Sequence, residues 1–76
     1  MTARSNKGYR NPVFVDRLKR LRLEFGLTQQ NLADKIGVTR MTMVYWETGR
    51  SFPRHDLLKE LALALNVNAD WLAGAE

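Results

Sequence analysis

Positive charge is the most concentrated chemical feature of this 76-residue chain, and most of it lies before residue 55. Residues 1–28 carry a net charge of +5, residues 29–54 carry +2, and residues 55–76 carry −3. Arg40 adds a specific capacity, because its planar guanidinium group can donate two hydrogen bonds to the O6 and N7 acceptors of a guanine base. One end of the molecule is therefore suited to a polyanion, and the other end is not.

Catalytic chemistry has little support in the same residues. The chain has no cysteine, and a zinc site built on its single histidine would need carboxylates alone beside it. Ser51, His55 and Asp56 are the nearest approach to a nucleophile set, but neighbouring residues on a helix, such as His55 and Asp56, point apart. We expect no catalytic residue, no metal, no cofactor and no small-molecule substrate, and hence a protein that is not an enzyme.

The length and the apolar runs limit the architecture. A chain of 76 residues is enough for one domain and too short for two. Its longest apolar run, residues 61–65, is far shorter than the ~20 residues that span a bilayer, and residues 1–12 are polar and basic. We expect a cytoplasmic protein that does not contact a membrane, in a cell without a nucleus or otherwise with free access to DNA.

Five short helices are expected to position the functional side chains. No strand is expected, because no segment alternates between apolar and polar residues with period two. Asn11 and Pro12 are typical of the cap and first residue of a helix, whose apolar residues recur every three or four positions. Pro53 is expected in the first turn of a fourth helix, which Asn66 ends in a left-handed conformation. Asn68 is expected to cap the fifth. The predicted fold class is all-α, around one core.

The most specific pattern lies in residues 28–48, where two short helices are joined by a tight turn. Thr28 and Thr39 are expected to cap them, and Gly37 can adopt the positive φ that the turn needs. Ala33 is small, as a close crossing of the two helices requires. The apolar positions that pin the pair to the core are Leu32, Ile36, Val38, Met43 and Trp46. This combination predicts a helix-turn-helix whose second helix projects from the body.

On these residues the sequence resembles the lambda-repressor-like family, the Cro/repressor type of helix-turn-helix protein, also called the XRE family. The resemblance covers about residues 15–72 and includes GLTQQNLADKIGVT at 26–39, WETG at 46–49 and NVNADWL at 66–72. Departures from the family pattern occur at Thr48, His55 and Asn66. The resemblance implies sequence-specific binding of double-stranded DNA by a transcriptional regulator. It also implies a nucleoid-associated protein of bacterial or phage origin.

The family also implies which residues contact DNA. Its third helix lies in the major groove, so the outward residues near the start of that helix are expected to read bases: Thr39, Arg40, Met41, Val44 and Tyr45. The groups expected to contact phosphates are Thr28, Gln29, Arg50, Arg54, Arg10, Lys7 and Arg4. Arg10, Lys7 and Arg4 belong to an N-terminal arm. This arm either wraps the duplex, enters a minor groove or is a terminal segment without a role in binding. Glu47 is expected to form a salt bridge with Arg22, and Trp46 is expected in the core.

Assembly and domain organisation complete the prediction. We expect a flexible basic arm at 1–12, a DNA-binding domain at 13–73, and a tail or the start of a linker at 74–76. One recognition helix reads too few base pairs to select a site in a genome, which favours a homodimeric repressor on a near-palindromic operator. In related repressors the fifth helix and the turn before it meet their symmetry mates. Here that nominates Val67, Asn68, Ala69 and Trp71, while Leu72 is expected in the core.

Several alternatives share the same sequence features. Within the family they are a restriction–modification controller, an antitoxin that represses its own operon, and the DNA-binding half of a longer phage repressor, which a linker-like end would suit. Outside it, the same fold can act as a protein-interaction module that binds a toxin or a polymerase subunit. The basic arm and the outward-facing Arg40 favour DNA over a protein partner.

Overall fold

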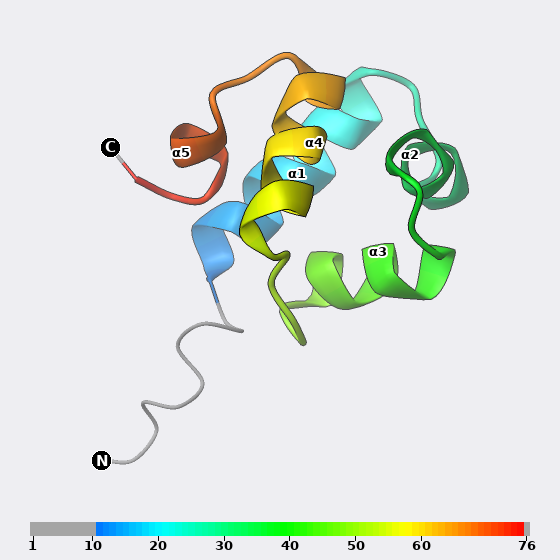
Figure 1. The fold of residues 1–76 in the computed structure, drawn as a ribbon, viewed down its shortest axis with the longest axis horizontal. Coiled ribbons are helices and arrows are strands. Elements are labelled where there is room, and N and C mark those ends of the chain that lie inside the picture. Colours follow the sequence, from blue (N-terminus) through cyan, green and yellow to red (C-terminus); the bar gives the residue numbers. More distant parts are fainter. Residues whose placement is uncertain (1–10, 76) are drawn as a thin grey trace.

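Five helices build the fold in the computed structural model, which describes residues 11–75 (Figure 1). They are α1 (Pro12–Glu24), α2 (Gln29–Ile36), α3 (Arg40–Thr48), α4 (His55–Leu65) and α5 (Ala69–Leu72). The predicted all-α class of five short helices is confirmed over this range. The predicted arm residues Arg4, Lys7 and Arg10 lie outside the described residues. Within residues 11–75, no helix is long and apolar enough to cross a membrane.

Polar side chains set the helix boundaries where the sequence predicts them. Side-chain oxygens accept hydrogen bonds from backbone N–H groups of the first turn at Asn11, Thr28, Thr39 and Asn68. Pro12 occupies the first turn of α1, where its missing N–H leaves no bond unmade. Asn66 ends α4 in the left-handed conformation, with φ of 58°. Because each of these caps is a short-range interaction, the local sequence was sufficient to predict it.

The start of α4 differs from the prediction. Pro53 does not lie in its first turn, because α4 begins at His55 and Arg54 occupies the N-cap position. Pro53 is buried in the preceding loop, next to Phe52, whose ring packs edge-on against that of Phe14 with centroids 4.8 Å apart. The proline is therefore a buried residue of the loop and does not start the helix. His55, where the family usually has an apolar residue, is exposed to solvent.

A single apolar core lies between the helices and receives residues from all five. α3 packs against α1 and α2, α4 packs against α2 and α5, and α5 packs against α1. In Figure 1, α3 lies along the lower edge of the fold and α5 at its upper left. The buried members of the core are Phe14, Leu18, Leu32, Ala33, Met43, Trp46, Leu58, Leu61, Ala62, Leu65 and Leu72. The inward positions of Trp46 and Leu72 confirm their predicted places in the core.

The start of α1 and the end of α5 are tied together. The Asn11 side chain accepts from the N–H of Phe14 with its oxygen, at 3.0 Å, and donates from Nδ2 to the carbonyl of Ala73, at 2.7 Å. Gly74 follows with φ of 104°, and a β-carbon there would stand 3.3 Å from the Asn11 side-chain oxygen. One asparagine thus caps the first helix and holds the last one beside it.

Candidate nucleic-acid interface

The turn between α2 and α3 sets the orientation of the two helices. Gly37 ends α2 in the left-handed conformation, with φ of 78°, and the N–H of Val38 returns to the carbonyl of Ala33 at 3.0 Å. A β-carbon at Gly37 would meet no atom within 4 Å, so the positive φ and not a lack of space favours glycine there. Ala33 and Met43 are fully buried where α2 and α3 pack. The predicted helix-turn-helix is therefore present.

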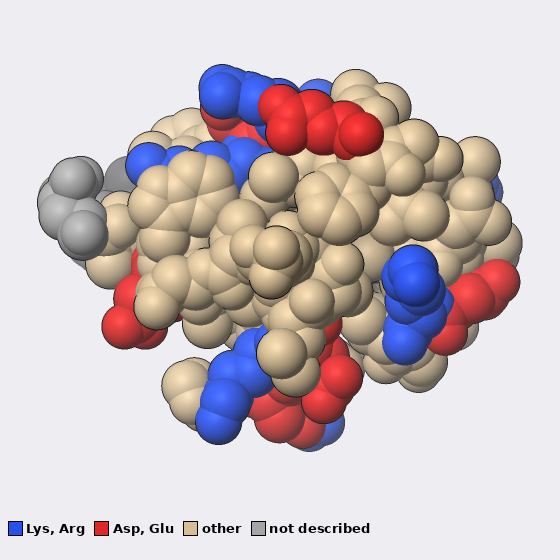
Figure 2. All heavy atoms as spheres, turned by 90° about the horizontal axis from the view of Figure 1, so that it is seen from above, with Lys and Arg blue, Asp and Glu red and all other residues tan. Residues whose placement is uncertain are grey.

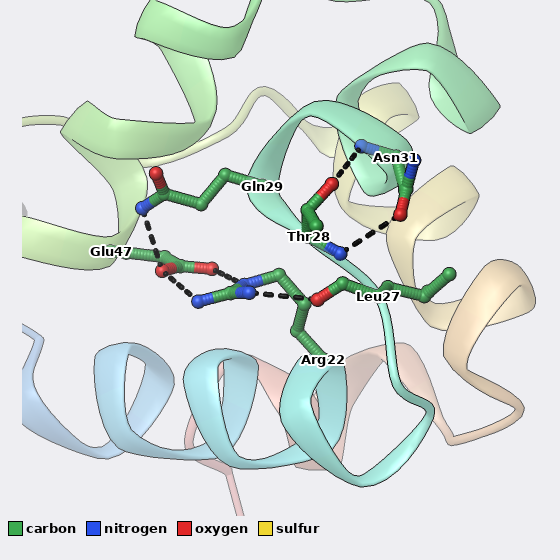
Figure 3. Close-up of polar contacts among 6 residues, drawn as sticks. All are labelled: Arg22, Leu27, Thr28, Gln29, Asn31 and Glu47. Atoms are coloured by element: carbon green, nitrogen blue, oxygen red, sulfur yellow. Dashed lines mark hydrogen bonds and ion pairs between the residues drawn. The ribbon is translucent and has the colours of Figure 1, made fainter.

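The start of α2 presents hydrogen-bond donors. Thr28 and Asn31 form a reciprocal capping box: the Thr28 hydroxyl accepts from the N–H of Asn31 at 2.9 Å, and the Asn31 side chain accepts from the N–H of Thr28 at 3.1 Å (Figure 3). The backbone N–H groups of Gln29 and Gln30 have no partner within residues 11–75. Free N–H groups at the positive end of a helix dipole suit an anion such as a phosphate.

A buried ionic network lies behind this helix start. Glu47 is the one charged residue that is buried among those the structure describes, at 3% exposure. Arg22 binds it with two nitrogens, Nε to Oε2 at 2.6 Å and Nη2 to Oε1 at 3.1 Å, and a third nitrogen donates to the carbonyl of Leu27 at 2.8 Å. The predicted salt bridge between α1 and α3 is confirmed.

Gln29 is also part of this network, which sequence reasoning missed. Its Nε2 donates to Oε1 of Glu47 at 3.1 Å, and Figure 3 shows the three side chains converging between α1, α2 and α3. The sequence contained a weak signal, since Glu47 follows the inward-facing Trp46 and needs polar partners. Which residue of α2 would supply one depends on how α2 crosses α3, and that is a property of the tertiary structure.

The predicted base-reading residues lie along α3 with different degrees of freedom. Arg40 is exposed in the first turn and forms no ion pair within the described part of the chain. Met41 is 51% exposed, and Val44 is half-buried. Thr39 is exposed, but its hydroxyl accepts from the N–H of Thr42 at 3.1 Å as the helix cap. Among these four, Arg40 combines the longest reach with the strongest donors.

The C-terminal end of α3 holds a second cation. The N–H groups of Arg50 and Ser51 both donate to the carbonyl of Tyr45, at 2.9 and 3.3 Å, across the turn at Gly49. The Arg50 guanidinium lies over the Tyr45 ring, 5.0 Å from its centroid. The charge of Arg50 is thus kept next to α3.

Arg54 follows in the same loop and is less fixed than Arg50. Its Nη2 lies 3.5 Å from a carboxylate oxygen of Asp56, with both side chains largely exposed. Such a pair contributes little in water, so the charge of Arg54 stays accessible to another anion.

Residues nominated for self-association surround α5. Trp71 is 39% exposed, Asn68 is an exposed cap, and Val67 and Ala69 are half-buried. The Arg17 guanidinium stacks over the Trp71 ring at 4.1 Å and donates to the Trp71 carbonyl. A shallow hollow beside this stack is lined by Pro12, Val13, Asp16, Arg17, Arg20 and Trp71. The stack fixes the indole in one orientation while leaving part of its surface open.

Figure 2 shows the side of the molecule opposite α3, and much of it carries no charged side chain. The C-terminal ends of α1 and α4 reach this side in Figure 1. They carry large apolar residues that are exposed, namely Leu23 at 64%, Phe25 at 49% and Leu63 at 76%. Within residues 11–75, no three potential metal ligands are grouped, and Asp56 pairs with Arg54.

Comparisons with known proteins agree with this geometry. Residues 18–72 match the helix-turn-helix family. The HTH-type transcriptional regulator YqaE of Bacillus subtilis is 38% identical over 64 residues, which are 84% of this chain and 55% of that protein. The HTH-type transcriptional activator BcrR of Enterococcus faecalis is 33% identical over 63 residues, which are 83% of this chain and 31% of that protein.

A solved structure gives the same result. The solution structure of the SOS-response transcriptional repressor LexA from Eubacterium rectale matches with a TM-score of 0.80 at 27% identity, over 88% of this chain and 71% of that chain. The present chain spans about half the length of YqaE and about a third of BcrR. The similarity to these curated relatives therefore concerns one part of each of them.

Proposed function

Because this chain belongs to the helix-turn-helix family and carries the DNA-binding domain of a transcriptional regulator, we propose that it represses transcription as a homodimer on a near-palindromic operator. The observation that carries this proposal is the arrangement of α2 and α3. Arg40 is exposed at the start of α3, and free backbone N–H groups lie at the start of α2 in the same helix-turn-helix motif. Base reading and phosphate anchoring are thereby offered by one rigid unit.

Each predicted contact has a place in this proposal. The start of α3 enters the major groove, where Arg40 donates to guanine, and Thr39, Met41, Val44 and Tyr45 complete the reading surface. Thr28 and Gln29 hold one phosphate at the start of α2. Arg50 and Arg54 follow the backbone beyond α3, and Arg4, Lys7 and Arg10 extend the contacts along the duplex.

Self-association is proposed through α5 and the turn before it, with Val67, Asn68, Ala69 and Trp71 at the contact. This surface lies at the upper left of the fold in Figure 1, away from α3, so pairing leaves the DNA-reading helices free. A two-fold axis there that sets the two copies of α3 about 34 Å apart would match one turn of the duplex. We prefer repression over activation because the structural neighbour LexA is named a repressor. Activation is the alternative, because BcrR is named an activator.

Exposed apolar side chains at the C-terminal ends of α1 and α4, namely Leu23, Phe25 and Leu63, favour a second candidate, a protein-interaction module or antitoxin. Such side chains suit a protein surface better than a polyanion.

Selection of bound sequences from a random duplex pool tests the two candidates together. The proposed function predicts enrichment of a site with two related half-sites and occupancy by two chains per duplex. Failure to enrich any sequence, with binding that barely responds to salt, would instead support the protein-interaction module. Fusing the operator to a reporter gene then gives the sign of regulation, and increased expression would replace the repressor by an activator.

A further inference from the structure

We propose that Glu47 is a positioning residue for DNA binding, whose carboxylate, held by Arg22, orients the Gln29 amide toward a phosphate. The inference rests on the proposed function, since it explains how the phosphate contact at the start of α2 is prepared. It assigns to a buried ion pair a role that reaches beyond the core.

The orientation of Gln29 follows from the chemistry of its partner. A carboxylate only accepts hydrogen bonds, so Glu47 requires the nitrogen of the Gln29 amide, and not its oxygen, to face it. Nε2 lies 3.1 Å from Oε1 of Glu47, and in Figure 3 the amide oxygen points away. Nε2 carries a second hydrogen, for which the described residues supply no acceptor, and Gln29 is the first residue of α2, where the backbone N–H groups of Gln29 and Gln30 are also free. The hydrogen bond to Glu47 therefore fixes which way the amide is turned, on a residue at the start of α2.

Glu47 can fix this side chain because burial and three hydrogen bonds hold its own carboxylate in place. Its side chain is 2% exposed, and Oε1 accepts from both Arg22 and Gln29 while Oε2 accepts from Arg22. Arg22 is anchored in turn to the carbonyl of Leu27. Within the described residues, every buried side-chain nitrogen and oxygen has a hydrogen-bond partner, so the hydrogen bonds of this buried network are fully satisfied.

The network also joins the two elements that are proposed to contact DNA. Glu47 belongs to α3, which carries Arg40, and Gln29 begins α2, which carries the phosphate anchor. A hydrogen bond between them holds the anchor at a fixed distance from the reading surface. Core packing alone does not require this arrangement, because a buried ion pair can often be replaced by apolar residues without loss of stability.

The sign of the mutational effect makes the proposal testable. Removing a negative charge from a DNA-binding protein raises its affinity for a polyanion on electrostatic grounds. Positioning predicts the opposite for Glu47→Gln: affinity for both the selected duplex and a random duplex falls, by roughly tenfold, the scale of a lost hydrogen bond to a charged group. Gln29→Ala should lose a similar factor, and the double variant should lose no more than Gln29→Ala. Gln30→Ala is the matched control, because Gln30 is the neighbouring amide and bonds to Asp34 on the exposed side.

Two further measurements keep the test decisive. If Glu47→Gln does not fold, the variant with Arg22→Met and Glu47→Met removes the acceptor while keeping apolar volume in the core. In folded protein without DNA, nuclear magnetic resonance relaxation of the Gln29 side-chain amide should show order close to that of the backbone, and the substitutions should abolish it.

The outcomes separate the two levels of inference. Additive losses in the double variant, unchanged or higher affinity in folded Glu47→Gln, or a mobile Gln29 amide in the wild type would each overturn the positioning role and leave DNA binding intact. A wild-type chain that binds no duplex would overturn the proposed function itself.

Discussion

The freedom of individual side chains distinguishes the residues on α3. Thr39 is engaged as a helix cap, Val44 is half-buried, and the Tyr45 ring faces Arg50. Arg40 is exposed, without an ion pair within residues 11–75, and its guanidinium is the group on this surface best suited to a guanine edge. Sequence-selective recognition by this helix is therefore expected to depend most on Arg40.

Arg40→Ala should weaken binding to the best operator by about 1–3 kcal/mol and relax preference at one base pair in each half-site. The free energy of unfolding should hardly change, because the side chain is exposed. Fluorescence anisotropy titrations on the operator and on single-base variants, together with urea denaturation, measure both effects. Equal losses on every sequence would show that Arg40 contacts the backbone and reads no base.

Individual helices could be predicted from the sequence where local interactions decide their limits. The caps at Asn11, Thr28, Thr39 and Asn68 are hydrogen bonds within three residues, and the left-handed Asn66 follows a similarly local rule. Pro53 does not lie in the first turn of α4, since it is buried in the loop before that helix, and burial of a loop residue depends on the tertiary structure. The bond from Gln29 to Glu47 joins residues 18 apart in sequence on different helices, so no local rule reveals it.

The turn between α2 and α3 depends on the left-handed conformation of Gly37. Gly37→Ala should lower the free energy of unfolding by about 1–2 kcal/mol, because a β-carbon makes the left-handed conformation costly. Gly37→Asn is the matched control, since asparagine visits this conformation more readily, and it should lose less. Urea denaturation followed by circular dichroism measures both variants. Alanine and asparagine with equal effects would show that the turn relaxes to another conformation.

Charge is distributed over the whole molecule in a way that salt can reveal. If Arg50, Arg54, Arg4, Lys7 and Arg10 neutralise about five phosphates, log K should fall against log salt concentration with a slope near −4 to −5. Deleting residues 1–10 should make that slope shallower by about 3, because three of the five cations are removed. A slope shallower than about −1 for the full chain on any duplex would contradict phosphate binding and favour a protein partner.

Self-association is the second prediction for the whole molecule. Trp71→Ala should reduce binding to an operator with two half-sites much more than binding to a single half-site, because the proposed contact lies at α5. Leu63→Ala is the matched control, since Leu63 is also apolar and exposed but lies outside the proposed contact. Gel-shift titrations on both duplexes compare the variants. Equal losses on the two duplexes would place the role of Trp71 within one subunit, where it stacks with Arg17.

The bond from Asn11 to the carbonyl of Ala73 makes the fold nearly a closed ring. A ring can be opened at a new place, so a short glycine-rich link between these two residues should allow a circularly permuted chain that starts in the loop at Ser51. The permuted chain would keep the helix-turn-helix uninterrupted, since α2 and α3 both precede that loop. For the same reason, the domain can be inserted into a surface loop of another protein, with both of its connections leaving from one corner.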